Sequence, residues 1–149
     1  MKLVHSIEIS VFSKPEDDLE SVKNGLIQLI PFNLEDNKIE LKETNATSFH
    51  EREIKILEVH LQKDKHTTQF INWLVQQLNE HTKQTIITQL ESRLDEHLHF
   101  YLRFDKNKWI TDKQLFLVDH GDCYHLKITF AVFPKKRDLM IKKIKEVFS

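Results

Sequence analysis

Apolar and polar residues alternate along several short stretches of this chain, and a period of two residues predicts β-strands that bury one face. Residues 7–11 and 98–104 show the pattern most clearly. Residues 123–133 repeat it after DHGD at 119–122, a turn sequence whose glycine tolerates a positive φ. We therefore predict a hairpin over residues 114–133.

Two further strands are predicted at residues 39–41 and 54–61, joined by a polar connection. The apolar side chains of the second strand change phase along its length. Ile54 and Ile56 occupy even positions, whereas Leu57 and the apolar residues after it occupy odd positions. One extra residue in a strand produces such a change, so we expect a β-bulge near Ile56.

Apolar residues at intervals of three and four predict helices elsewhere in the chain. The predicted helices cover residues 19–29, 70–78, 86–94 and 140–147, and a polar helical turn is expected at 105–112. Before the first helix, SKPE at 13–16 has the form of a capping box, in which Ser and Glu side chains bond to backbone amides. Pro31 and Pro134 are expected to end the elements that precede them.

Strands that cluster as hairpins, with helices at intervals, favour an α+β fold over a parallel α/β fold. The simplest arrangement has two layers, with a single, mostly antiparallel sheet and helices packed on one face. A chain of 149 residues has the length of one ordinary domain and can bury a hydrophobic core. We expect a single domain that covers residues 1–149.

The composition excludes several kinds of site. Two glycines are too few for the glycine-rich loops that bind phosphates, and the one cysteine allows neither an internal disulfide nor a cysteine-based zinc site. No apolar run approaches the ~20 residues that a membrane-spanning helix needs. The first ten residues resemble a strand and lack the apolar region of a signal peptide, so we expect a cytoplasmic protein, and no cofactor is indicated.

Charge is distributed unevenly, although the net charge is only −1. Residues 1–80 hold 9 basic and 14 acidic side chains, whereas residues 81–149 hold 13 basic and 9 acidic ones. A nucleic-acid site is therefore expected mainly in the C-terminal half. Residues 135–145 hold six cations and one acid, a pattern that fits a phosphate-binding helix and also an ordinary solvated one.

The polar phase of the predicted strands supplies a second basic surface. If 98–104 pairs with 123–133, then Tyr101 and Arg103 share the solvent face with Lys127. Aromatic rings stack on unpaired bases and cations neutralise phosphates, so such a face is suited to RNA. The predicted RNA-binding residues are Tyr101, Arg103, Lys106, Lys108, Lys113, Lys127, Lys135, Lys136 and Arg137.

Short motifs along most of the chain resemble one known family. They comprise Arg-x-Asp, a strand ending in Tyr-x-Arg-x-Asp-Lys, a short helix, Leu-x-Leu, an acidic turn and an alternating strand. In this sequence they fall on Arg93 and Asp95; Tyr101, Arg103, Asp105 and Lys106; Leu115 and Leu117; Asp119 and Asp122; and Leu126, Ile128 and Phe130. The chain thus resembles an archaeal RNA-binding family associated with the exosome. The resemblance implies a fold similar to ribosomal L5-like proteins and a non-catalytic role as an accessory of RNA processing.

A second function stays open. A scaffold subunit of an RNA-processing complex needs no contact with RNA, and Trp73 or Trp109 is then a candidate anchor for a protein partner. Catalysis has little support, because no arrangement of carboxylates or of Cys123 indicates a shifted pKa. The segment from His120 to His125 resembles a set of metal ligands, but residues 119–122 are foremost a turn sequence, so no metal site is predicted. The sequence does not decide whether the chain forms a homodimer.

Overall fold

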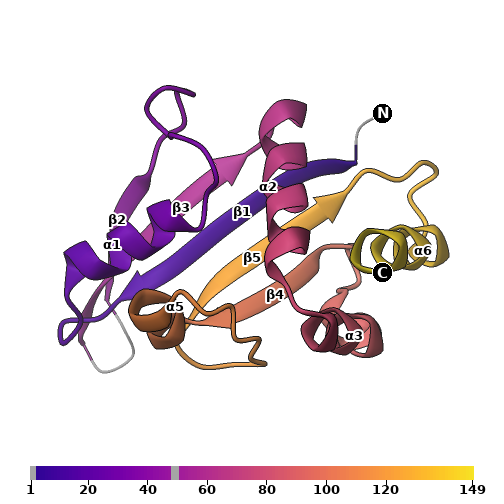
Figure 1. Cartoon of the computed structure of the whole chain (residues 1–149). Coiled ribbons are helices and arrows are strands. Elements are labelled where there is room, and N and C mark those ends of the chain that lie inside the picture. Colours follow the sequence, from indigo (N-terminus) through magenta and orange to yellow (C-terminus); the bar gives the residue numbers. More distant parts are fainter. Residues whose placement is uncertain (1–2, 48–50) are drawn as a thin grey trace. The chain divides into compact units, whose positions relative to one another are not determined.

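The computed structural model describes residues 3–47 and 51–149. The strands form one five-stranded antiparallel sheet in the order β2-β3-β1-β5-β4 (Figure 1). They are β1 (Val4–Ser13), β2 (Lys42–Thr47), β3 (Glu53–Leu61), β4 (Phe100–Asp105) and β5 (Cys123–Phe130). The helices are α1 (Leu19–Gln28), α2 (Asp64–Gln77), α3 (Glu80–Thr88), α4 (Leu90–Arg93), α5 (Lys106–Asp112) and α6 (Arg137–Phe148). The predicted α+β class with an antiparallel sheet is confirmed.

The chain divides into two compact units. Among the described residues, unit 1 contains 3–7, 61–102 and 127–149, and unit 2 contains 8–47, 51–60 and 103–126. Strands β1, β3, β4 and β5 each contribute residues to both units, β3 through Leu61 alone. The single domain over residues 1–149 stays a prediction.

The core of unit 1 forms because alternate residues of β4 and β5 are apolar. Phe100 and Phe130 are fully or almost fully buried, and their rings meet at a centroid distance of 6.1 Å. The ring of Phe148 from α6 lies 6.1 Å from that of Phe100, so α6 packs on this face of the strands. Helix α2 buries Phe70 and Leu74, and its Thr67 hydroxyl donates to the Val4 carbonyl at 3.1 Å.

The core of unit 2 is closed by two aromatic side chains that bond to the backbone of α1. The indole Nε1 of Trp109 donates to the Gly25 carbonyl at 2.8 Å, and the Tyr124 hydroxyl donates to the Val22 carbonyl at 2.8 Å. A Cβ atom at Gly25 would overlap the Tyr124 hydroxyl, so this position requires glycine. Trp109 is therefore part of the core and not an exposed anchor for a partner.

Two predictions in the N-terminal part of the chain were wrong. Ser13 forms no capping box, because it is the buried last residue of β1 and α1 begins only at Leu19. The turn between them is closed by Asp17, whose carboxylate accepts from the Lys14 amide at 2.9 Å. The strand expected at 39–41 is also displaced, since β2 begins at Lys42. Its sequence, KETNAT, is polar on both faces and carries no alternation to detect.

No bulge near Ile56 interrupts the pairing of β3 with β2. Strands β2 and β3 pair in continuous register from Lys42 opposite Glu58 to Thr47 opposite Glu53. Ile54 and Ile56 are half-buried and belong to the phase opposite to the buried Leu57. Their apolar character reflects a partly exposed sheet face, where isolated apolar residues are ordinary.

Near the other edge of the sheet, β4 begins two residues later than expected. The Asp95 carboxylate accepts from the amides of His97 and His99, at 2.9 and 2.8 Å, and Leu98 adopts a φ of 65°. The predicted hairpin at 114–133 was wrong: Leu117 forms an isolated antiparallel bridge to Phe104 of β4, and the neighbours of β5 are β1 and β4. The predicted turn is present, and its Gly121 has a φ of 93°.

Candidate nucleic-acid interface

In unit 1, the outward phase of β4 and β5 forms what we call the strand face, made by Tyr101, Lys127 and Thr129 together with His99. The strand residues are half-buried, while the alternate residues are buried. The Tyr101 hydroxyl donates to the Asp95 carboxylate at 3.0 Å. A hydrogen bond of 2.8 Å joins the His99 Nδ1 to the Thr129 hydroxyl. The strand face thus presents an aromatic ring and an imidazole whose positions are fixed by hydrogen bonds.

Asp95 organises the segment that precedes β4. Burial acts to raise the pKa of its carboxyl, but hydrogen bonds from the His99 amide, the Tyr101 hydroxyl and the His97 amide outweigh burial and hold that pKa below its ordinary value. The carboxylate is therefore ionised at neutral pH. The orientation of the Tyr101 ring depends on this charge.

The surroundings of His99 are positive. Burial lowers the pKa of its imidazole, and the charge of Lys127 lowers it further against the opposing charge of Asp95. Lys135 and His97 act in the same direction as Lys127. Lys127 and Lys135 thus both act electrostatically on the His99 imidazole, from the strand face and from the connection after β5.

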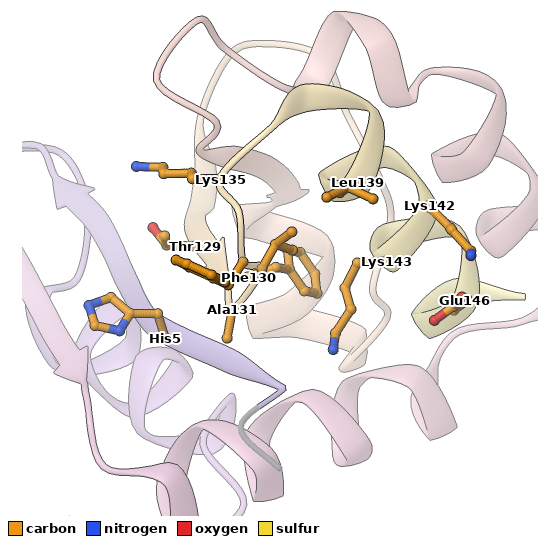
Figure 2. Close-up of a pocket in the computed structure, with 11 residues that line it drawn as sticks. His5, Thr129, Phe130, Ala131, Lys135, Leu139, Lys142, Lys143 and Glu146 are labelled. Atoms are coloured by element: carbon orange, nitrogen blue, oxygen red, sulfur yellow. The ribbon is translucent and has the colours of Figure 1, made fainter.

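Where β5 ends, a groove of about 770 Å³ opens between the connection that leaves the strand and one side of α6; we call it the β5–α6 groove (Figure 2). It is lined by His5, Thr129, Phe130, Ala131, Val132, Phe133, Lys135, Leu139, Lys142, Lys143 and Glu146. All of these residues belong to unit 1. Thr129 also belongs to the strand face, so the two surfaces adjoin.

The groove combines apolar and cationic side chains. Phe133 is 97% exposed, which leaves both faces of its ring open to a ligand. Among the described residues, Lys135, Lys142 and Lys143 have neither a hydrogen-bond acceptor nor a salt-bridge partner for their ammonium groups. Cations without such partners are available to neutralise phosphates.

Lys106, one of the predicted phosphate ligands, has a different role. Its side chain is only 2% exposed, and its ammonium donates to the Phe12 carbonyl at 3.0 Å and to Asp17 at 2.7 Å. Asp122 lies 3.8 Å away and also forms an ion pair with Lys14. The ammonium is used within unit 2, so Lys106 has no donor to offer to RNA.

Two other predicted cations bond to the backbone. Arg137 donates to the carbonyls of Glu91, Leu94 and Asp95, each at 3.2 Å, and to the Glu91 carboxylate at 3.1 Å. Its guanidinium thereby joins the start of α6 to α4 and to the two residues that follow α4. Lys113 donates to the carbonyls of Trp109 and Ile110 at the end of α5, at 3.2 and 2.7 Å.

The remaining predicted cations fall into both units. Lys108 is exposed in unit 2 and lies 4.9 Å from the centre of the Phe116 ring. Arg103 is half-buried in unit 2, where its charge acts on the Cys123 thiol. Lys136 is exposed in unit 1, directly before α6. Of the predicted set, Tyr101, Lys127, Lys135 and Lys136 are half-buried or exposed in unit 1, and the Arg137 side chain is 40% exposed but bonded to carbonyls.

Sequence reasoning missed Phe133 and His5 as site residues. Phe133 extends the apolar alternation of β5 and so has the pattern of a strand residue, but β5 ends at Phe130. The FP pair at 133–134 is the available signal, because proline after an aromatic residue favours a connection over a strand. His5 is 126 residues from Ala131, and no local pattern relates the two.

Other chemistry has little support in the part of the chain that the structure describes. No group of three His, Cys, Asp or Glu side chains there could hold a metal ion. Burial raises the pKa of the Cys123 thiol, which opposes a nucleophilic role. Across residues 3–47 and 51–149, no helix has the length and apolarity needed to span a bilayer.

Known RNA-binding proteins match most of this chain. A family model described as RNA binding matches residues 6–130. An RNA-binding protein of Pyrococcus abyssi is 23% identical over 142 residues, which cover 95% of this chain and 92% of that protein. An uncharacterised protein of Methanocaldococcus jannaschii is 24% identical over 145 residues, with 95% of both chains covered.

Solved structures share the fold. The crystal structure of a DUF54 protein from Archaeoglobus fulgidus has a TM-score of 0.85 at 26% identity and covers 97% of this chain and 99% of its own. A DUF54 protein from Methanothermobacter thermautotrophicus has a TM-score of 0.80 at 24% identity, with 99% of both chains covered.

Proposed function

We propose that this chain, which belongs to the RNA-binding family matched over residues 6–130, binds RNA directly through the strand face and the β5–α6 groove of unit 1. One observation carries the proposal. Lys135, Lys142 and Lys143, which have no salt-bridge partner among the described residues, line one groove together with the almost fully exposed ring of Phe133. Cations beside an exposed aromatic ring are the combination that RNA-binding surfaces use for phosphates and bases.

Tyr101 and Lys127 extend this surface along the strands. The hydroxyl of Tyr101 is held by Asp95, so the ring loses little conformational freedom when a base stacks on it. Lys127 acts on His99 together with Lys135, which supports a continuous positive field between the strand face and the groove. These features favour affinity for the RNA backbone with little dependence on sequence.

The predicted cations fall into two groups: those that are bonded within the protein and those that are available to RNA. Lys106, Lys113 and Arg137 stabilise the protein, because their donors already have acceptors within it. Lys136, beside the groove, adds long-range attraction. Arg103 and Lys108 of unit 2 stay as predicted additional contacts.

We further propose that the protein is a non-catalytic accessory of RNA processing and contacts RNA itself. The RNA-binding relative from Pyrococcus abyssi supports direct contact over a pure scaffold role. Association with subunits of an RNA-processing complex, such as an exosome, and a cytoplasmic location are expectations of the same proposal.

The test is fluorescence anisotropy with a labelled single-stranded RNA, from low to physiological salt. Lys143→Glu should weaken binding and lower the salt dependence by about one phosphate contact, a slope of ~0.7 in log Kd against log salt. Lys145→Glu is the matched control, because it makes the same charge change on α6 outside the groove. Equal effects of both variants would exclude the groove, and no binding by the parent at low salt would favour the scaffold.

A further inference from the structure

Phe133 of unit 1 is far more exposed than is usual for a large apolar side chain. It is 97% exposed, whereas the other large apolar side chains that protrude from the described part of the chain, Phe12, Ile27 and Phe116, are 40–53% exposed. Phe116 is further covered by Lys108, whose ammonium lies 4.9 Å from the ring centre. An aromatic ring with both faces in water loses this unfavourable hydration when a flat apolar ligand stacks on it.

The chemistry of the groove changes from its floor to its rim. Phe130, Ala131 and Leu139 provide an apolar floor, and Lys135 and Lys143 provide cations (Figure 2). His5, from β1, adds an imidazole that can bond to the edge of a base. A nucleotide has two matching parts, because its base has flat, largely apolar faces and its phosphate is anionic. The volume of about 770 Å³ lies within the range of ~300–1,000 Å³ that is usual for sites that enclose small ligands.

Glu146 is the acidic residue that lines the groove, and its position affects where a phosphate binds. It lies four residues after Lys142 and three after Lys143 on α6, so its carboxylate offsets charge from both lysines. Lys135 lies on the opposite side of the groove from Glu146 (Figure 2), so a phosphate is attracted most strongly by Lys135.

From these features we propose that the β5–α6 groove binds one unpaired nucleotide of single-stranded RNA, with its base stacked on Phe133 and its two flanking phosphates attracted by Lys135 and Lys143. The proposal rests on the proposed function and specifies its ligand. In duplex RNA the base faces are covered by their neighbours, and the deep, narrow major groove of A-form RNA excludes side chains. The ring of Phe133 can therefore reach a base only where the strand is unpaired.

The experiment measures anisotropy with a labelled single-stranded RNA and with the duplex of the same sequence, at one salt concentration. Phe133→Ala should weaken binding of the single strand on the order of 5- to 100-fold and leave duplex binding unchanged. Phe133→Trp should retain single-strand binding, because it keeps a stacking ring. Phe116→Ala is the control for loss of an exposed aromatic residue in unit 2.

A second readout detects the stacked base directly. A single strand that contains 2-aminopurine should lose fluorescence when it binds the parent and keep it with Phe133→Ala. If the parent binds RNA and responds to Lys143→Glu but not to Phe133→Ala, the nucleotide site is excluded and the proposed function stands. A preference for the duplex also overturns the nucleotide site. If the parent binds neither RNA, the proposed function fails as well.

Discussion

Lys106→Met offers a sharp test of whether a cation in this chain serves the fold or the ligand. Methionine fills the space of the aliphatic part of lysine but has no ammonium. The variant loses the hydrogen bond to the Phe12 carbonyl and the ion pair with Asp17, at 3.0 and 2.7 Å, and leaves the Asp17 carboxylate without its strongest partner.

The size of the loss follows from the burial of the pair. Removing one partner of a buried ion pair costs about 3–5 kcal/mol, because a charge stays behind in a poorly solvated site. Asp17 is 20% exposed and keeps the hydrogen bond from the Lys14 amide, so we expect the lower end, about 3 kcal/mol. For a chain of this length, such a loss lowers Tm by roughly 6–12 °C.

Urea unfolding and thermal melts of the parent and Lys106→Met measure this loss, with Lys108→Met as the exposed control on the same helix. The control should change the free energy of unfolding by no more than about 1 kcal/mol, the value of its contact with Phe116. Affinity for RNA, measured well below the melting temperature, should be the same for the parent and Lys106→Met. A Lys106→Met protein of full stability whose RNA binding has a lower salt slope would refute the reasoning, because it would place the Lys106 ammonium on a phosphate.

Three other predictions concern stability. Gly25→Ala should destabilise the protein by about 1–3 kcal/mol through overlap with the Tyr124 hydroxyl, and Tyr124→Phe in the same chain should recover part of the loss in urea unfolding. Asp95→Asn should cost about 1–3 kcal/mol at pH 7. Since the pKa of Asp95 is lowered by folding, the stability it provides is present above the unfolded pKa of about 4 and is lost as the pH falls through the folded value, so parent and variant should converge in acid. Arg137→Gln should lower the free energy of unfolding by about 1–3 kcal/mol, because three carbonyls lose a donor, and should leave the salt slope of RNA binding unchanged.

The fold could be predicted as far as periodic patterns extend. Strands β4 and β5 alternate strictly because one face packs on a core, and the structure buries the apolar phase of both. The same logic fails for β2, an edge strand that buries little and therefore needs no apolar phase. It also fails at Ser13, where the SxxE pattern suggests a cap but the serine is needed as the buried end of β1.

The candidate site was harder to predict, because sequence shows where cations are but not which of them already have acceptors. Lys106 and Lys135 look alike in the sequence, each in a basic segment after an apolar strand. The acceptors of Lys106 come from Phe12 and Asp17, 94 and 89 residues earlier in the chain, and only the fold brings them together. Arg137 is likewise indistinguishable from its lysine neighbours until the carbonyls of residues 91–95 are placed beside it.

The attraction of RNA therefore depends on the uncompensated charges at the surface and not on the total charge of the chain. The C-terminal half of the chain holds an excess of cations, but several of them pair with carboxylates or carbonyls within the fold and contribute little to an external field. Lys135 and Lys143 have no such partners among the described residues, so their counterions are free to be released when a phosphate arrives. Because these two lysines lie at the same groove as Phe133, electrostatic attraction and stacking act on the same nucleotide. Their substitutions should then be non-additive: once Phe133→Ala has removed the base from the groove, Lys143→Glu should weaken RNA binding less than it does in the parent.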